Sequence, residues 1–267
     1  MANPVLAELK RSNRVENIHR GAFVVVDENG KICFSAGDVD RAIFPRSAIK
    51  SMQALALFKS GAVQKFDLSN AQIAICCASH HAEPRHIEAV SGLLETIGCT
   101  ADDLECGAHA PSNRRARNAL FEAGEKPGNI HNNCSGKHAG MLAVAKAIGV
   151  PLKGDSERNH MAQFLVRQSI EELTGASLSS QMCGTDGCSV PTWAAPLKSF
   201  ADGFARMATG KNLDQKTRQA TNRIFDAIVE NPFLVGGSGT FDTEVMEHFG
   251  SRLVCKIGAQ GVFCGAI

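Results

Sequence analysis

Strand-like segments lie at both ends of this chain, and helical segments fill its middle. The N-terminal strands are expected at residues 5–9, 21–26 and 31–35. Residues 253–257 and 261–267 predict a hairpin at the other end. Because the strands flank the helices instead of alternating with them, the pattern predicts an α+β fold. We expect an α/β sandwich in which the N- and C-terminal strands form one antiparallel sheet with flanking helices.

Apolar residues recur at helical spacing through the centre of the chain. The first of these helices, residues 47–58, follows Phe44-Pro45-Arg46. Further helices are expected at residues 83–97, 113–123, 137–148, 156–173, 192–209, 213–230 and 240–249. Residues 71–78 predict a buried segment, and the pattern leaves its type open between strand and helix.

Composition narrows the classes of partner. The 267 residues are 44% hydrophobic and carry a formal net charge of +1, so one large core is expected and neither nucleic acid nor a membrane surface is favoured. The apolar runs are far shorter than the roughly 20 residues of a membrane span. The N-terminus shows no secretory signal, which predicts a cytoplasmic protein. The ten cysteines are therefore expected to be free thiols, the alternative being a disulfide framework.

Two short segments hold an unusual density of reactive groups. Residues His131 to Gly140 include a thiol, an amine and two imidazoles, and a second thiol, Cys188, follows after about fifty residues. Two thiolates bind zinc well, with His131 or His138 as a conventional third ligand. The alternative is that Cys134 and Cys188 are separate buried thiols, because no Cys-x-x-Cys is present.

Ser47 and Lys50 form a Ser-x-x-Lys pair at the start of a predicted helix. Residues at i and i+3 share a helix face, so an uncharged Lys50 amine could remove the proton that makes Ser47 a poor nucleophile. Backbone N–H groups at the helix start could hold an oxyanion. The alternative is a surface lysine one turn from an N-terminal serine, since such a pair occurs by chance in a chain of this length.

Other polar residues have two interpretations each. Ser79, at the end of a buried segment, could face a site, whereas the histidines that follow it are typical of a polar cap near a helix start. Lys256 in a terminal strand is either edge protection or a site cation. Asp186 lies between glycines and is typical of a turn carboxylate. The glycine loop at residues 236–239 lacks the Gly-Lys-Ser/Thr of a nucleotide site.

Taken together and in order, four motifs resemble the Rhizobium etli-type L-asparaginases of the asparaginase II family. The motifs are Phe44-Pro45-Arg46-Ser47-x-x-Lys50, His131 to Gly140, Asp186-Gly187-Cys188-x-x-Pro191 and Lys256-x-Gly258-Ala259-x-Gly261. The resemblance covers essentially the whole chain. It implies a fold similar to serine β-lactamases and penicillin-binding proteins. It also implies a single domain over residues 1–267 that lacks a strand and a helix with which family members continue.

The resemblance implies roles for individual residues. Ser47 is the nucleophile, Lys50 is its base, and Ser79 and Lys256 form a supporting pair that relays protons and adds positive charge. Zinc is implied beside the substrate pocket, where it modulates activity, with the ligands Cys134, Lys137 and Cys188. The residues expected to bind substrate are Arg46 and His138 for the α-carboxylate, Asp186 for the α-amine, and Asn133. A homodimer is also implied.

The resulting hypothesis is an amidohydrolase that converts L-asparagine to L-aspartate and ammonia. Two alternatives remain at this point. One is a related acyl-serine hydrolase that acts on a β-lactam or a peptide amide, because such enzymes share the Ser-x-x-Lys pair. The other is a non-enzymatic zinc- or amino-acid-binding protein that uses only the region of Cys134, Lys137 and Cys188.

Overall fold

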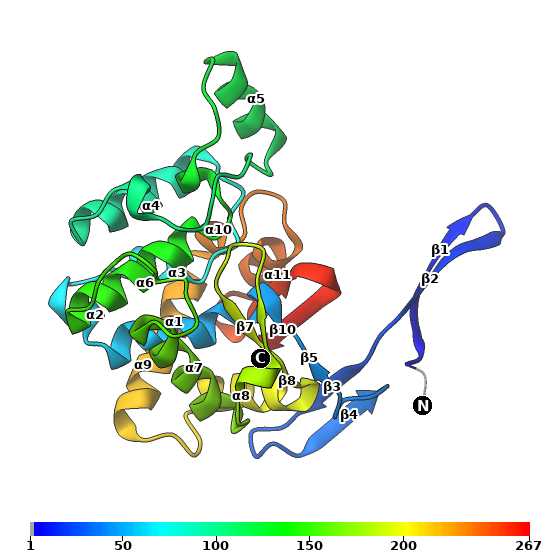
Figure 1. Ribbon diagram of the computed structural model, residues 1–267. Helices are drawn as coiled ribbons and strands as arrows, with labels where there is room; N and C mark the ends of the chain where they lie inside the picture. The colour runs from blue at the N-terminus through cyan, green and yellow to red at the C-terminus, as the bar shows by residue number, and fades with distance from the viewer. Residues whose placement is uncertain (1–2) are drawn as a thin grey trace.

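Helix α1 (Lys50–Lys59) is the centre of the fold in the computed structural model, which describes residues 3–267. Its residues from Lys50 to Leu57 are all buried. It packs against α7 (Met161–Thr174), α6 (Ser135–Ile148) and α9 (Gln215–Glu230) (Figure 1). A polar side chain inside such a helix costs free energy unless it meets partners, and the largest one, Lys50, lies at its start.

The other helices surround this centre. They are α2 (Ala62–Lys65), α3 (Asn70–Cys76), α4 (Pro84–Thr96), α5 (Arg114–Glu122), α8 (Leu197–Thr209), α10 (Pro232–Val235) and α11 (Phe241–Phe249). The segment left open above is thus a helix, α3, and it begins with a capping box formed by Ser69 and Gln72. Helix α7 begins five residues later than predicted, after the N-cap His160.

The strands form small antiparallel sheets, so the mixed helix and strand composition of the α+β prediction is confirmed. The pairs are β1 (Val5–Arg11) with β2 (Arg14–Arg20), β3 (Phe23–Val26) with β4 (Ile32–Ala36), β5 (Ala42–Ile43) with β8 (Ala195–Pro196), β6 (Cys183–Thr185) with β7 (Pro191–Trp193), and β9 (Val254–Gly258) with β10 (Val262–Ala266). The strands β7 and β8 replace the first part of the helix predicted over residues 192–209, which begins only at Leu197.

The single sheet expected from the two chain ends is not formed within residues 3–267. The hairpins β3–β4 and β9–β10 are separate sheets that both pack on α8. Between β3 and β10 lies a groove of about 480 Å³, and the helix contributes the small side chains Ala201, Ala205 and Ala208 to its lining. Helix α8 therefore supports both hairpins, and the groove separates β3 from β10.

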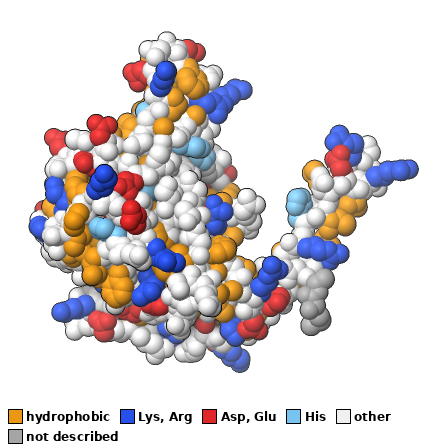
Figure 2. Space-filling model, in the orientation of Figure 1, with side chains coloured by type: hydrophobic (Ala, Val, Ile, Leu, Met, Phe, Trp, Pro, Cys, Tyr) orange, Lys and Arg blue, Asp and Glu red, His pale blue; other side chains and the backbone are white. Residues whose placement is uncertain are grey.

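Two elements project from the body. The β1–β2 hairpin is exposed along its whole length and extends away as an arm, with Leu6, Leu9 and Ile18 among its exposed apolar side chains (Figure 2). Helix α5 projects elsewhere and has no buried residue. All ten cysteines are free, as predicted. Among residues 3–267, no helix has both the length and the hydropathy that crossing a membrane requires.

Candidate active site

Lys50 joins three separate elements through one buried side-chain nitrogen. Its side chain is 1% exposed, and Nζ donates to the carbonyl oxygen of Ala78, to Ser79 Oγ at 3.1 Å and to Cys134 Sγ at 3.2 Å. Ala78 and Ser79 follow α3, and Cys134 immediately precedes α6. The first residue of the central helix thus binds both the segment that follows α3 and the segment that precedes α6.

Ser47 lies in a tight turn just before α1. The turn is a 3-10 helix, Arg46–Ile49, and Arg46 has a φ of +52°, in the left-handed region that costs a side-chain-bearing residue energy. Strand β9 runs against this turn. A Cβ atom at Gly258 would lie 2.8 Å from Pro45 O and 3.0 Å from Ala48 N, so only glycine permits the approach.

Lys256 precedes Gly258 by two residues in β9 and therefore points to the same face of the strand. Its side chain is buried, and its Nζ lies 3.3 Å from Asp242 Oδ2 and donates to Ile257 O at 2.9 Å. Asp242 was not predicted: an acidic residue in the first turn of a helix is explained by the helix dipole alone, so the sequence gives no signal for it.

Lys50 was predicted to act on Ser47, but its hydrogen bonds go to other residues. Among the described hydrogen bonds, none joins Lys50 Nζ to Ser47 Oγ, and the hydroxyl that Lys50 contacts is that of Ser79. The predicted roles of Ser47 as nucleophile and Lys50 as its base stay predictions. The structure places Ser47 one turn before the amine and Ser79 at its hydrogen-bonding distance.

The two thiols of the predicted metal set lie together. Cys134 donates a hydrogen bond to Cys188, and Lys137 Nζ donates to Cys188 Sγ at 3.0 Å. The bond from Cys134 and the charge of Lys137 lower the pKa of Cys188 to about 5, although burial acts in the opposite direction. Donating to Cys188, together with burial, raises the pKa of Cys134 to about 12. Of the two thiols, Cys188 is therefore the one that ionises more readily.

These residues fit zinc if the third protein donor is the lysine. Within residues 3–267, no group of three His, Cys, Asp or Glu side chains is arranged to hold a metal ion. Of the conventional candidates, His131 has its Nδ1 engaged by the N–H of Gly128, which leaves Nε2 as its donor, and His138 is buried with neither ring nitrogen hydrogen-bonded to a described residue. Lys137 is buried beside both thiols, but they raise its pKa against the effect of burial, so its amine would have to lose a proton to coordinate.

Arg46 and Asp186, expected at opposite ends of the substrate, form an ion pair with each other. The distance from Arg46 Nε to Asp186 Oδ1 is 2.7 Å, and the side chains are 28% and 10% exposed. Burial opposes ionisation of Asp186, yet the charge of Lys137 and the hydrogen bond from Arg46 lower its pKa. This carboxylate thereby links the turn of Ser47 to the thiol cluster.

The other two predicted substrate residues differ in accessibility. His138 is 0% exposed, and burial lowers its pKa to about 3. A buried neutral imidazole does not supply the positive charge that we expected of it. Asn133 is half-buried, and its carbonyl oxygen accepts the N–H of His80 at 3.2 Å. His80 in turn bonds Ser135 Oγ and the N–H of Ala82, which agrees with the structural interpretation of the histidine segment.

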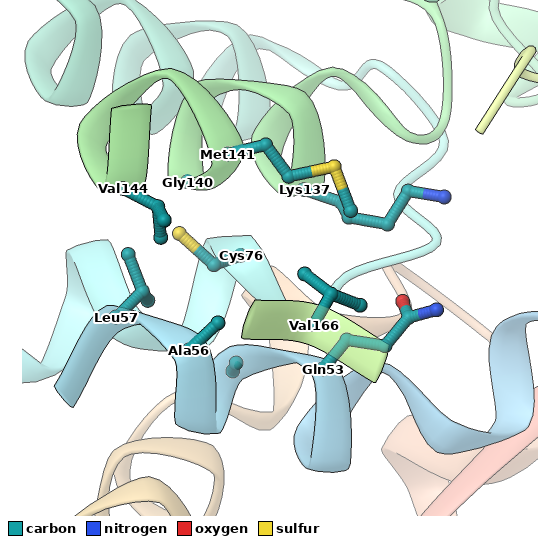
Figure 3. A pocket seen from close by; sticks show the side chains of 10 residues that line it. Gln53, Ala56, Leu57, Cys76, Lys137, Gly140, Met141, Val144 and Val166 are labelled. Atoms are coloured by element: carbon teal, nitrogen blue, oxygen red, sulfur yellow. The ribbon is translucent and has the colours of Figure 1, made fainter. Parts of the chain in front are cut away.

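A small cavity lies behind Lys137, between α1, α3, α6 and α7 (Figure 3). Its volume is about 20 Å³, room for about one water molecule and too little for an amino acid. Figure 3 shows the amine of Lys137 directed away from this apolar space. The side chains of Arg46, Ser79 and Asp186 are half-buried, so the cluster reaches solvent on their side and not through this cavity.

Comparison with known proteins identifies the family of the chain. A search of curated proteins finds no match. The family model for L-asparaginase II matches residues 7–267, which spans the Ser47 turn, the thiol cluster and strand β9. The chain therefore belongs to the L-asparaginase II family.

Proposed function

We propose that this protein hydrolyses the side-chain amide of L-asparagine to give L-aspartate and ammonia. Family membership supports this reaction class. The observation that carries the mechanism is the meeting of buried Lys50 with Ser79 and Cys134, next to the turn that bears Ser47. We further propose that the family subclass is the Rhizobium etli type and that the fold is related to serine β-lactamases.

The proposed reaction uses an acyl-enzyme. Ser47 Oγ attacks the carboxamide carbon while Lys50, as the free amine, accepts the hydroxyl proton. The C–N bond then breaks, and the leaving nitrogen takes a proton through Ser79, which the Lys50 hydrogen bond holds within reach. Water cleaves the resulting ester, which releases aspartate and restores Ser47. Lys256 adds positive charge near the developing oxyanion.

Substrate charges would be recognised at the ion pair described above. The guanidinium of Arg46 suits the α-carboxylate, and the carboxylate of Asp186 suits the α-amine. Asn133 provides amide hydrogen bonds, and His138 contributes as a neutral imidazole. We propose zinc binding by Cys134, Lys137 and Cys188, where a bound ion would orient groups at the thiol end of the pocket. The chain's own Asp186 connects that end to Arg46.

Ammonia release separates the candidate substrates. Wild type should release ammonia from asparagine faster than from glutamine and should not open a chromogenic β-lactam. Ser47→Ala should lower turnover by about 10³-fold or more, as for loss of a nucleophile. The matched control is Ser51→Ala, because that hydroxyl lies in the same helical region, is buried and has no hydrogen-bond partner among the described residues. Full activity in Ser47→Ala would overturn the nucleophile assignment.

Two further measurements test the accessory proposals. Metal analysis of wild type and Cys134→Ala should show zinc only in the former, and equal zinc in both would remove Cys134 from the ligand set. Light scattering should give twice the chain mass of 28.4 kDa if the proposed homodimer forms. We also propose a cytoplasmic location, in keeping with ten free thiols.

A further inference from the structure

Lys256 and Asp242 form the most deeply buried ion pair described in residues 3–267. Their side chains are 5% and 1% exposed, and Nζ lies 3.3 Å from Oδ2. In every other described ion pair, both side chains are at least 10% exposed. A charge pair so far from water is costly unless its geometry is fixed by further hydrogen bonds.

Asp242 has such a bond on the side of strand β9. Oδ2 also accepts the backbone N–H of Ile257 at 3.4 Å. The loop before α11 closes on the other oxygen, since a Cβ atom at Gly236 would lie 3.0 Å from Oδ1. One carboxylate therefore holds both the side chain of Lys256 and the backbone of the next residue in β9.

The surroundings of Lys256 need a counter-charge. Asp242 from α11 contacts it, and the other titratable side chains near enough to interact with its charge are Lys50 from α1, Cys77 after α3, His81 before α4, Cys134 before α6 and Cys255 in the same strand. Burial lowers the pKa of Lys256 to about 8, and the charge of Lys50 acts in the same direction, while Asp242 acts against both. Near neutral pH, Lys256 remains a cation because that carboxylate is present.

We propose that Asp242 is a positioning residue for amide hydrolysis, which holds Lys256 in place as a cation beside Lys50 and the Ser47 turn. This inference rests on the proposed function. Asp242 does not touch the substrate in this scheme, because its side chain is 1% exposed and Oδ2 is held by Lys256 and by the backbone of Ile257. It acts through the strand that carries Lys256.

The test compares Asp242→Asn with Glu244→Gln in the full-length protein. Glu244 lies on the same helix, also in its first turn, and is exposed, so its variant removes an equivalent charge without touching Lys256. Turnover of asparagine should fall at high pH as Lys256 loses its proton. In Asp242→Asn this alkaline limb should move about 1 to 2 pH units downward, the value of a charged hydrogen bond.

At pH 8 the same change should reduce kcat about 5- to 50-fold. KM should stay unchanged, because Asp242 makes no substrate contact. Glu244→Gln should match wild type in both constants and in its pH profile. A folded Asp242→Asn that also matches wild type overturns the proposal. If that variant does not fold, Asp242→Glu is measured instead. Because it retains a carboxylate, the alkaline fall in its turnover should occur at the same pH as in wild type. A fall one pH unit lower overturns the proposal.

Failure of the proposed function looks different. If wild type releases no ammonia from asparagine, or if Ser47→Ala remains fully active, the reaction or its nucleophile is wrong whatever Asp242 does. If wild type is active and Ser47→Ala is inactive while Asp242→Asn is normal, only the role of Asp242 falls.

Discussion

Lys50 is a lysine at the start of a helix whose residues from Lys50 to Leu57 are all buried, which is unusual for a side chain that normally keeps its ammonium in water. Its three hydrogen-bond acceptors offset part of the cost of burial. A residue retained at such a cost is a candidate for function more than for stability.

Replacing Lys50 by Met should therefore separate activity from stability. We expect turnover of asparagine to fall by about 10²- to 10⁴-fold, the usual contribution of a general base. The melting temperature should change little, because Met fills a similar volume in the core. Lys59→Met is the control, since Lys59 lies at the other end of the same helix and pairs with Glu172. Parallel losses of turnover and stability in Lys50→Met would indicate a structural lysine instead.

At the level of single residues, short motifs in the sequence pointed to candidate site residues, but properties that depend on tertiary packing could not be predicted from it. The spacing of Ser47 and Lys50 predicted a helix start, and the structure has a 3-10 turn over Arg46–Ile49 followed by α1 at Lys50. The proximity of Lys137 to Cys188 was implied by the family resemblance, whereas spacing alone favoured a histidine. Asp242 has no motif, because its partner is fourteen residues away across a strand that must fold first. The neutral state of His138 follows from burial, which no local pattern encodes.

At the level of elements, two glycines let α6 approach the neighbouring helix. A Cβ atom at Gly136 would lie 2.2 Å from the carbonyl oxygen of Ile75 in α3, whereas one at Gly140 would lie 2.8 Å from the side-chain sulfur of Cys76. A backbone atom cannot turn aside as a side chain can. The start of α6, with Cys134 and Lys137, therefore depends on the absence of a side chain at position 136.

Gly136→Ala should lower stability by about 2 to 4 kcal/mol and weaken zinc binding, because α6 must shift away from α3. Gly140→Ala should cost less. Gly92→Ala in α4 is the matched control, since nothing lies within 4 Å of the added methyl group and alanine favours a helix by roughly 0.5–1 kcal/mol. Thermal denaturation and zinc titration check all three, and equal stability of the variants at 136 and 92 would contradict this account.

Sequence periodicity predicted some helices well. Amphipathic helices such as α4 and α9 were predicted nearly to their ends, because periodicity and caps act locally. The helix predicted from residue 192 was wrong over its first five residues, which lie in and beside β7 and β8; the partner of β8 is β5, about 150 residues earlier in the chain. Strand β2 was not predicted, because all of its residues are exposed and its sequence does not alternate between apolar and polar residues.

For the whole molecule, one buried carboxylate should tie stability to pH. Asp155 is 0% exposed, and burial together with the charge of Glu105 raises its pKa from 3.8 to about 7. A folded pKa above the unfolded value means that the folded state binds the proton more tightly. Stability contributed by the protonated form is thus complete below about pH 4 and is lost as pH rises towards 7.

Asp155→Asn should remove this dependence. The variant should exceed wild type in unfolding free energy by roughly 2 to 4 kcal/mol at pH 8, and the difference should shrink steadily as the pH is lowered to 5. Urea denaturation at several pH values measures it. Asp102→Asn changes an exposed carboxylate and should give a difference that does not vary with pH. A constant difference for Asp155→Asn would contradict the assignment.

The groove between β3 and β10 also governs how molecules meet one another. Each bordering strand has a partner on one side alone within residues 3–267, and Phe23, Val25 and Phe263 are 44%, 49% and 46% exposed beside it. The backbone N–H and C=O groups along an unpaired strand edge, next to exposed apolar side chains, can pair with extended segments of other molecules. Concentrated solutions of this protein should accordingly tend toward intermolecular β-pairing, and work with it calls for dilute conditions.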